Sequence, residues 1–397
     1  MTRTRLAVHP DLRRPQAGGL RLSRVGVDVR YLQRPGVGIS RYVDQAVRDL
    51  IEAGARVTLI TDSERHAGAL RAEFPPAEAV ALPGRSGFLW EQRRLPRHLA
   101  AAGYDAYVAP ANYGLPLIYR GATPLILVVH DLIPLRLGHL YLPRRPLWAV
   151  KYLLSTAIAG ARATQVVAPS HATARDIGRL LRRRNVAVAY PPIPAPETGT
   201  GRNQDATVPD PLIDPASRTV KPYFIYNGGA DIRKNVPTLL RAFAKVRQAL
   251  PDTELVMIGP GQEHYRHLAR RLGVTDGVHA LGYVDEATKS AILRSAVALI
   301  YPSRMEGFGL PILEAMAAGI PAVSGTGGSL REVGGQAVTY VPRITDEALA
   351  AAMVSVTPEA IRAGARSAGA AQLRLLADRR QASTLAGIVA ATIGRRA

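Results

Sequence analysis

Two glutamates, Glu306 and Glu314, lie eight positions apart around a glycine-containing segment that follows an apolar run. Pro311 between them suits the first turn of a helix, because the N–H that proline lacks would have no partner there. The segment therefore predicts a strand, a loop and a helix N-terminus, whose free N–H groups and dipole attract an anion. Gly307 and Gly309 would let a phosphate approach the backbone closely. The two carboxylates could accept hydrogen bonds from hydroxyl groups on either side of a bound diphosphate.

A second chemical candidate lies between another predicted strand and a helix, in the segment NGGADIRKN at 227–235. Arg233 offers bidentate hydrogen bonding and Lys234 a compact positive charge, which suits a nucleoside diphosphate that departs with growing negative charge. Asn235 is expected to cap the helix that follows, and Pro237 suits its first turn. The alternative is a solvated cationic pair, although cations are disfavoured at that end of a helix.

Three further positions could contact a ligand. His130 ends a predicted strand and could bond a sugar hydroxyl, while Asp131 either orients it or caps a turn. Gly38 belongs to a glycine-rich turn before a helix, which permits close approach of phosphate or sugar, although a simple turn explains it almost as well. Ser170 is interpreted as a helix cap.

The elements that must position these residues alternate between short β-branched runs and helical patterns, which predicts parallel sheets with crossover helices. We expect an α/β protein with two doubly wound domains whose ligands bind beyond the carboxyl ends of the strands. The predicted strands are Val25–Arg30, Arg56–Thr61, Tyr104–Ala109, Leu125–His130, Gln165–Pro169, Val186–Tyr190, Tyr223–Asn227, Glu254–Ile258, Ala298–Tyr301 and Pro321–Ser324. The predicted divisions are a basic tail at 1–24, an N-terminal domain at 25–190, a proline-rich linker at 191–219, a C-terminal domain at 220–375, and a C-terminal helix at 376–397 that packs back on the N-terminal domain.

The composition limits the classes of protein to consider. With 47% hydrophobic and 21% charged residues, the 397-residue chain can fill two cores and is not a disordered polymer. The net charge of +20 is compatible with nucleic acid, anionic lipid or a phosphorylated substrate. The sequence has no apolar run of the length that a membrane-spanning helix needs. The absence of cysteine excludes disulfides and thiolate metal sites.

The spacing of Glu306 and Glu314, with PS before it and EAMAAGIP after it, resembles the E-x7-E motif of glycosyltransferase family four, a retaining family with the GT-B fold of two Rossmann-like domains facing a central cleft. The resemblance implies that Glu306 contacts the donor sugar, that Glu314 binds the ribose, and that the N–H groups at 308–310 bind phosphate. It also implies that Arg233 and Lys234 stabilise the leaving diphosphate near His130. One departure is the pair at 228–229, where many relatives carry Gly-Arg. The implied catalytic set is His130, Arg233, Lys234 and Glu306, and the implied donor-binding set is Gly38, Gly229, Phe308, Gly309, Leu310 and Glu314.

The resemblance is nearest to bacterial exopolysaccharide and lipopolysaccharide mannosyltransferases. It implies transfer of a hexose, with mannose from GDP-mannose expected, to a polyprenyl-diphosphate-linked saccharide, without cofactor or metal. Alternatives are a UDP-glucose-type hexosyltransferase, a sugar-nucleotide epimerase or hydrolase on the same fold, and a nucleic-acid-binding protein. The last is disfavoured because basic residues are not interleaved with aromatic ones.

The prediction of how the enzyme reaches its acceptor depends on the segment 142–161, which combines basic, aromatic and apolar residues. Such a helix suits an anionic membrane surface, and this predicts a cytoplasmic enzyme attached peripherally to the inner face of the cytoplasmic membrane. An amphipathic core helix with solvated arginines is an equal alternative.

Overall fold

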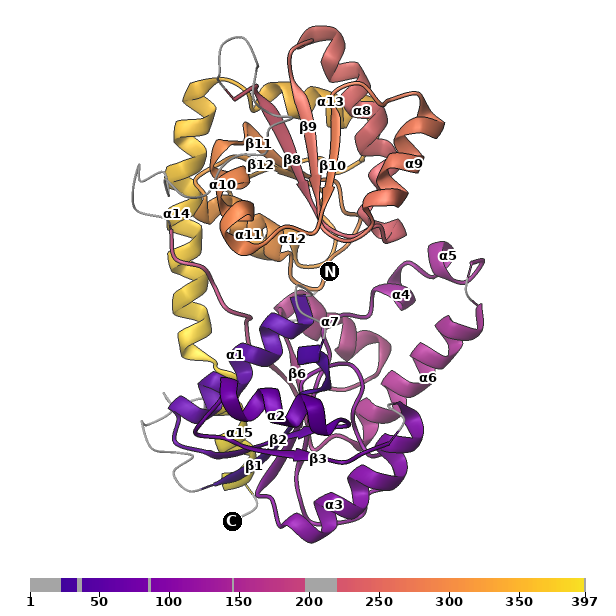
Figure 1. Cartoon of the computed structure of the whole chain (residues 1–397), viewed down its shortest axis with the longest axis vertical. Coiled ribbons are helices and arrows are strands. Elements are labelled where there is room, and N and C mark those ends of the chain that lie inside the picture. The colour runs from indigo at the N-terminus through magenta and orange to yellow at the C-terminus, as the bar shows by residue number, and fades with distance from the viewer. Residues whose placement is uncertain (1–22, 34–37, 85–86, 145, 197–219, 396–397) are drawn as a thin grey trace, which may run out of the picture.

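The computed structural model describes residues 23–33, 38–84, 87–144, 146–196 and 220–395. Two domains stack end to end, each a parallel sheet with helices on both faces (Figure 1). The predicted α/β architecture of two Rossmann-like domains is confirmed. The basic tail up to residue 22, the turn at 34–37 and most of the proline-rich linker lie outside the described residues.

The N-terminal sheet has seven strands in the order β3-β2-β1-β4-β5-β6-β7, all paired in parallel. Chain order reverses between β1 and β4, and the strand ends on either side of such a point border a crevice. The strands are β1 Arg24–Asp28, β2 Arg56–Thr61, β3 Glu78–Ala81, β4 Ala106–Ala109, β5 Leu125–Val128, β6 Gln165–Ala168 and β7 Val186–Val188. The helices are η1 Arg30–Gln33, α1 Gly38–Glu52, α2 Glu64–Glu73, η2 Trp90–Arg94, α3 Leu95–Ala102, α4 Ile133–Arg136, α5 Gly138–Tyr141, α6 Pro146–Arg162 and α7 His171–Leu180.

The C-terminal sheet has six parallel strands in the order β10-β9-β8-β11-β12-β13, with the reversal between β8 and β11. The strands are β8 Tyr223–Asn227, β9 Glu254–Ile258, β10 Val278–Gly282, β11 Ala298–Tyr301, β12 Ala322–Ser324 and β13 Val338–Tyr340. The helices in this half of the chain are η4 Ile232–Lys234, α8 Val236–Ala249, α9 Gln262–Leu272, α10 Glu286–Ser295, α11 Leu310–Ala317, α12 Leu330–Gly334, α13 Asp346–Ser355, α14 Glu359–Ala382 and α15 Leu385–Gly394, the last of which packs on the N-terminal domain.

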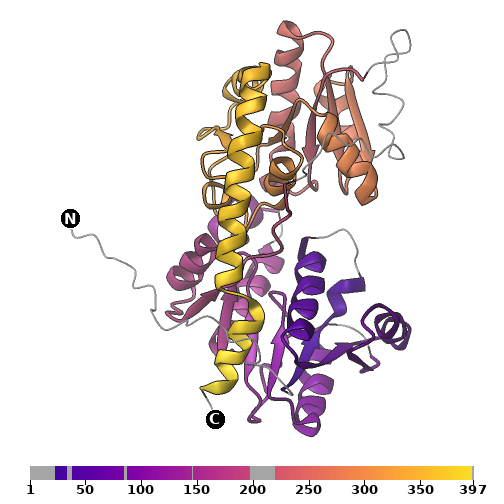
Figure 2. The same ribbon diagram turned by 90° about the vertical axis from the view of Figure 1, so that its left-hand side faces the viewer.

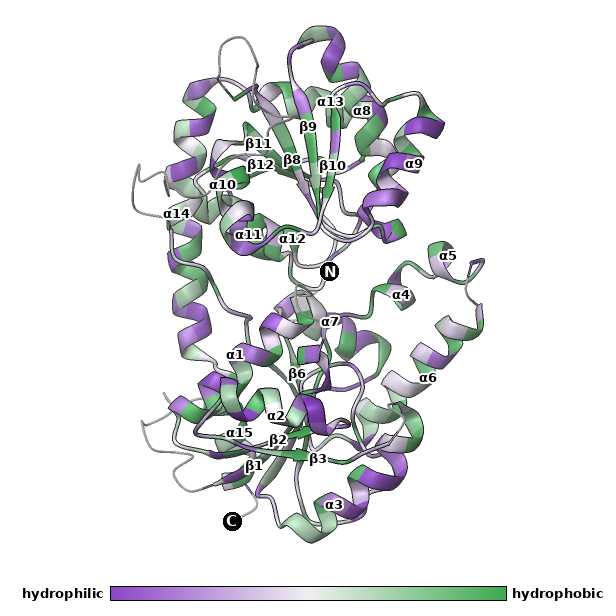
Figure 3. Cartoon of the chain, in the orientation of Figure 1, coloured by the Kyte–Doolittle hydropathy of each residue, from purple (hydrophilic) through white to green (hydrophobic). Residues whose placement is uncertain are grey.

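Hydrophobic residues concentrate in the strands, and the outer helices carry hydrophilic stripes (Figure 3). The central strands are buried on both faces, as helices on both sides of a parallel sheet require. The N-terminal domain therefore has one core on each face of its sheet, and the C-terminal domain has one large continuous cluster.

The end of the described chain joins the two domains. Helix α14 packs on α11 in the C-terminal domain and runs past the junction toward the N-terminal domain (Figure 2). Thr384 caps α15, whose residues Leu385, Ile388 and Val389 are buried in the N-terminal core beside α1. The predicted boundary at 376 falls inside α14, since this helix begins well before it at Glu359.

One local prediction was wrong. Asn235 precedes α8, but its side chain makes no cap hydrogen bond and its backbone is left-handed, with φ 58°. Asparagine tolerates this conformation, and it follows the tight turn of η4 that ends at Lys234. The Asn235 amide oxygen instead accepts hydrogen bonds from Arg304 and Thr238.

Candidate active site

The candidate site is a cavity of about 440 Å³ between the two domains. Its C-terminal wall is formed where the neighbouring strands β8 and β11 end, at the point of chain reversal in that sheet. The loop after β8 carries Gly229, Arg233 and Lys234, and the loop after β11 carries Glu306 and leads into α11. Ligands of open α/β sheets bind at such a position.

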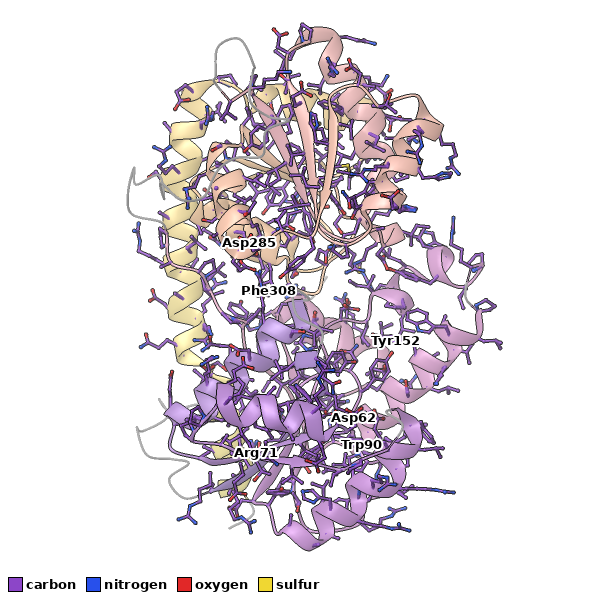
Figure 4. The ribbon with its side chains drawn as sticks, viewed as in Figure 1. Asp62, Arg71, Trp90, Tyr152, Asp285 and Phe308 are labelled. Atoms are coloured by element: carbon purple, nitrogen blue, oxygen red, sulfur yellow. The ribbon has the colours of Figure 1, made fainter. Side chains whose placement is uncertain are left out.

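The N-terminus of α11, whose first N–H groups have no partner within the helix, borders this cavity. Gly309 is the residue before the helix, with φ 105°, a conformation that residues with a side chain rarely adopt. Pro311 occupies the first turn, as predicted. Leu310 and Pro311 line the cavity together with Phe308, which Figure 4 places at the junction of the domains. This is a suitable arrangement for an anion.

Glu306 lies at the centre of a buried ionic cluster. Its carboxylate accepts a hydrogen bond from Lys234 Nζ at 2.7 Å and another from Ser303 Oγ, and Arg233 lies 3.5 Å away. Lys234 also donates to the Tyr301 hydroxyl and lies 4.6 Å from the centre of that ring. Buried charges are tolerated when they are paired in this way.

The pKa values of the cluster follow from burial and pairing. Burial alone would raise the pKa of Glu306, but the positive charges of Lys234 and Arg233 outweigh it and lower the pKa to about 2. Burial lowers the pKa of Lys234, and Glu306 opposes that effect. The ammonium lies 2.7 Å from a carboxylate with so low a pKa, and this pairing favours the charged form of both groups.

Glu314, one turn into α11, is surrounded by donors from three elements. Its carboxylate accepts hydrogen bonds from Asn227 at the end of β8, from Lys289 Nζ on α10 at 2.9 Å, and from Arg41 on α1 at 2.6 Å. Arg41 belongs to the N-terminal domain and also pairs with Glu286 on α10. This guanidinium therefore connects the two domains.

His130 enters the cavity from the N-terminal domain at the end of β5. Its Nε2 lies 2.8 Å from the carbonyl oxygen of Pro110, so Nε2 carries the proton. Burial lowers the pKa of the imidazole, which is therefore neutral at pH 7 and has Nδ1 as an acceptor. Asp131 accepts a hydrogen bond from the N–H of Ile133, so it caps the following turn, one of the two roles expected for it.

The loop that carries Glu306 makes direct contact with the N-terminal domain. A side chain at Gly307 would lie 2.3 Å from the carbonyl oxygen of His130, so only glycine permits this approach. The hydroxyls of Ser170 and Thr173 donate to the carbonyl oxygen of Gly307 at 2.8 and 3.2 Å. Ser170 also caps α7, as predicted.

A second interdomain contact lies at the start of α7. The carboxylate of Glu332, from α12 in the C-terminal domain, accepts hydrogen bonds from the N–H groups of His171 and Ala172 and from the hydroxyl of Tyr190. A carboxylate at this end of a helix is stabilised by the free N–H groups and the dipole. These contacts join α12 of the C-terminal domain to the N-terminal domain.

All ten predicted site residues line this one cavity, and their individual roles stay predictions. They are Gly38, Gly229, His130, Arg233, Lys234, Glu306, Phe308, Gly309, Leu310 and Glu314. Sequence reasoning did not identify Arg41, Glu286 and Lys289 as site residues. Glu286 and Lys289 lie three positions apart, a spacing that places them on one face of a helix, and this was the available signal for those two residues.

Two family models match the chain, one on each domain. The model described as Glycosyltransferase Family 4 matches residues 37–195, and the model described as Glycosyl transferases group 1 matches residues 214–360. Among curated relatives, glycogen synthase of Mycobacterium tuberculosis is 36% identical over 166 residues, which is 41% of this chain and 40% of that protein. Phosphatidyl-myo-inositol mannosyltransferase of Mycobacterium leprae is 32% identical over 165 residues, which is 41% of this chain and 44% of that protein. O-antigen chain mannosyltransferase B of Escherichia coli is 34% identical over 158 residues, which is 38% of this chain and 41% of that protein.

The chain thus matches about two fifths of the length of these relatives. Solved structures extend the likeness of fold to the whole chain. Sucrose-phosphate synthase from Thermosynechococcus elongatus has a TM-score of 0.67 at 21% identity, covering 94% of this chain and 98% of that one. Anabaena HepE in complex with UDP-glucose has a TM-score of 0.65 at 16% identity, with the same coverage.

The fold, with its cavity between two parallel-sheet domains, is that of the GT-B glycosyltransferases. Within this class, the chain is of the family-four type, since the family-four model matches its N-terminal domain and the group 1 model matches its C-terminal domain.

Proposed function

We propose that this protein is a retaining glycosyltransferase that transfers a hexose from a nucleotide-sugar donor, with mannose from GDP-mannose as the expected donor. The observation that carries the proposal is the cluster of Arg233, Lys234 and Glu306 beside the N-terminus of α11. It combines two cations and free N–H groups, which suit a leaving diphosphate, with a carboxylate that suits sugar hydroxyls.

The state of Glu306 favours a reaction without a covalent intermediate on this residue. Its carboxylate is bound by Lys234 and Ser303 and has a pKa of about 2, so it is a weak base and a poor nucleophile. We expect the acceptor hydroxyl to attack the donor sugar from the same face as the departing diphosphate. An oxygen of that leaving diphosphate takes the proton of the hydroxyl. Catalysis then depends on positioning and on stabilising the leaving group. Because Lys234 and Arg233 supply the positive charge, we expect transfer without a metal ion.

The choice of mannose rests on the relatives named as mannosyltransferases. A UDP-glucose donor is the second candidate, supported by the resemblance in fold to HepE, whose structure contains UDP-glucose. An epimerase on the same fold is less well supported, since the cationic pair opposite Glu306 suits permanent departure of the diphosphate.

The donor is tested by calorimetry with GDP-mannose, UDP-glucose, UDP-N-acetylglucosamine and GDP, in the presence of EDTA. We expect GDP-mannose to bind most tightly and both Lys234→Met and Glu306→Gln to weaken its binding. Tighter binding of a UDP-sugar would keep the site but replace the donor. If no sugar nucleotide binds, the proposal is wrong, and a salt-sensitive gel shift would then test the nucleic-acid alternative.

For the acceptor we propose a polyprenyl-diphosphate-linked saccharide of exopolysaccharide or lipopolysaccharide synthesis, reached at an anionic membrane surface on the cytoplasmic side. Within the described residues, the structure has no helix with the length and hydropathy of a membrane span. However, α6 exposes a row of large apolar side chains beside Lys151. They are Leu147 (86% exposed), Val150, Leu154 and Ile158, spaced so that they share one face. An exposed apolar face with adjacent positive charge suits anionic lipid.

Sedimentation with phosphatidylglycerol vesicles tests this part. We expect the double variant Leu147→Ser, Leu154→Ser to bind severalfold more weakly than wild type. Ile361→Ser, at an exposed position on α14, is the matched control and should bind normally. Equal binding of all three proteins would refute docking through α6.

A further inference from the structure

Arg41 differs from the other partners of Glu314 in its origin. Asn227 and Lys289 belong to the same domain as Glu314, whereas Arg41 lies on α1 of the other domain, 273 positions away. Of the charged partners of Glu314 among the described residues, Arg41 is the one that shifts when the domains move relative to each other. The pair is partly accessible, since the side chains of Arg41 and Glu314 are 37% and 15% exposed.

Arg41 donates a hydrogen bond to the Glu314 carboxylate, the same group to which the hydroxyls of a bound ribose would donate. If Glu314 binds ribose hydroxyls, as the proposed function implies, those hydroxyls must donate to the same two carboxylate oxygens. Arg41 and Lys289 both donate to Oε1 of Glu314, and Asn227 donates to Oε2. Arg41 and the ribose are therefore competitors for one acceptor group.

Arg41 can release Glu314 without losing a charged partner. Its second guanidinium nitrogen pairs with Glu286, a more exposed carboxylate on α10. Arg41 also lines both the donor cavity and a second cavity of about 290 Å³ beside Pro191 and Pro192. Glu286 and Glu314 line both cavities as well, so the guanidinium borders open space next to both of its partners.

We propose that Arg41 is a positioning residue of the donor site that competes with the donor's ribose for Glu314 and moves fully onto Glu286 when a nucleotide binds. This inference rests on the proposed function. Arg41 would then be an internal competitor that lowers donor affinity, and it would also connect the N-terminal domain to the C-terminal domain. Removing Arg41 should therefore tighten donor binding and slow transfer, a combination that neither a donor-binding residue nor a purely structural one would produce.

The test is calorimetric binding of GDP, UDP and pyrophosphate to wild type and to Arg41→Met. An exposed ion pair has a free energy that corresponds to a factor of roughly two to five in affinity. We expect Arg41→Met to bind the preferred nucleoside diphosphate two- to fivefold more tightly, with a lower KM for the donor and a lower kcat. Pyrophosphate has no ribose, so its affinity should not increase.

Two further variants isolate the contact. In a Glu314→Gln background, Arg41→Met should no longer tighten nucleotide binding, because the contested carboxylate is absent. Arg48→Met removes an ion pair with Asp44 within the same helix and should leave nucleotide affinity unchanged. If Arg41→Met does not fold, Arg41→Lys serves instead, since lysine reaches one carboxylate at a time and should give a smaller increase in affinity.

Weaker or unchanged nucleotide binding by Arg41→Met would overturn the inference while leaving the proposed function intact, provided that wild type binds the nucleotide. If wild type binds neither nucleoside diphosphate, the proposed function fails, and the inference fails with it.

Discussion

Replacing Lys234 by methionine keeps most of the side-chain volume but removes the ammonium that lies 2.7 Å from Glu306. The fall of the Glu306 pKa from 4.5 to about 2 corresponds to about 3 kcal/mol favouring the charged carboxylate. Lys234 is the largest favourable contributor and Arg233 the next. Because the pKa of Lys234 is itself lowered by burial, part of this gain is offset. We therefore expect the variant to lose about 2 kcal/mol of unfolding free energy at pH 7.

The pH dependence of this loss has a definite sign. The pKa of Glu306 is depressed in the folded protein, so its stabilisation is complete above about 4.5 and disappears as the pH falls toward 2. The stability difference between wild type and Lys234→Met should therefore shrink over that interval. Urea unfolding followed by circular dichroism, repeated at several pH values, measures it.

A double variant separates stability from catalysis. Lys234→Met with Glu306→Gln removes both charges, so it should be about as stable as wild type or at least clearly more stable than the single variant. Transfer should nevertheless fall at least a hundredfold in both variants, because the charge on the leaving diphosphate is unmatched. A single variant as stable as wild type, or a double variant no more stable than the single one, would refute the assignment of a buried ion pair.

Three other perturbations test the contacts between the domains. Gly307→Ala should lower transfer at least tenfold with little change in unfolding temperature, because its β-carbon would clash with the His130 carbonyl; an undiminished rate would contradict this. Glu332→Gln should cost about 1 kcal/mol in urea unfolding, since the amide offers one oxygen where the carboxylate offers two; an equal midpoint would show that the contact is unimportant. Arg380→Met removes a hydrogen-bonded ion pair with Asp49 and should increase the radius of gyration in small-angle scattering, while an unchanged radius would exclude a role for this pair in domain orientation.

The strands that sequence reasoning located correctly and those it missed differ in position. Four predictions match the structure residue for residue, at β2, β8, β9 and β11, and each strand is a continuous run of mostly buried residues. The three missed strands β3, β10 and β13 all lie at the edges of their sheets. These three strands are partly exposed and carry no long apolar run, whereas the fourth edge strand, β7, was predicted because the buried residues Ala189 and Tyr190 extend its run.

The same distinction holds for the site. Glu306 and Lys234 were found because each follows a recognisable strand, and strand ends in such folds meet at one edge of the sheet. The contact between Arg41 and Glu314 depends on the relative orientation of two domains, and no local pattern encodes it. Gly307 was assigned to phosphate approach, whereas the structure adds a stricter requirement from the His130 carbonyl.

The position of α15 affects how the protein is made. Leu385, Ile388 and Val389 fill part of the N-terminal core, next to residues of α1 such as Val43 and Val47. A ribosome must synthesise the whole C-terminal domain before it delivers this helix. Until then the nascent N-terminal domain exposes the apolar surface that α15 covers in the folded protein, so we expect its early folding intermediate to be a substrate for chaperones.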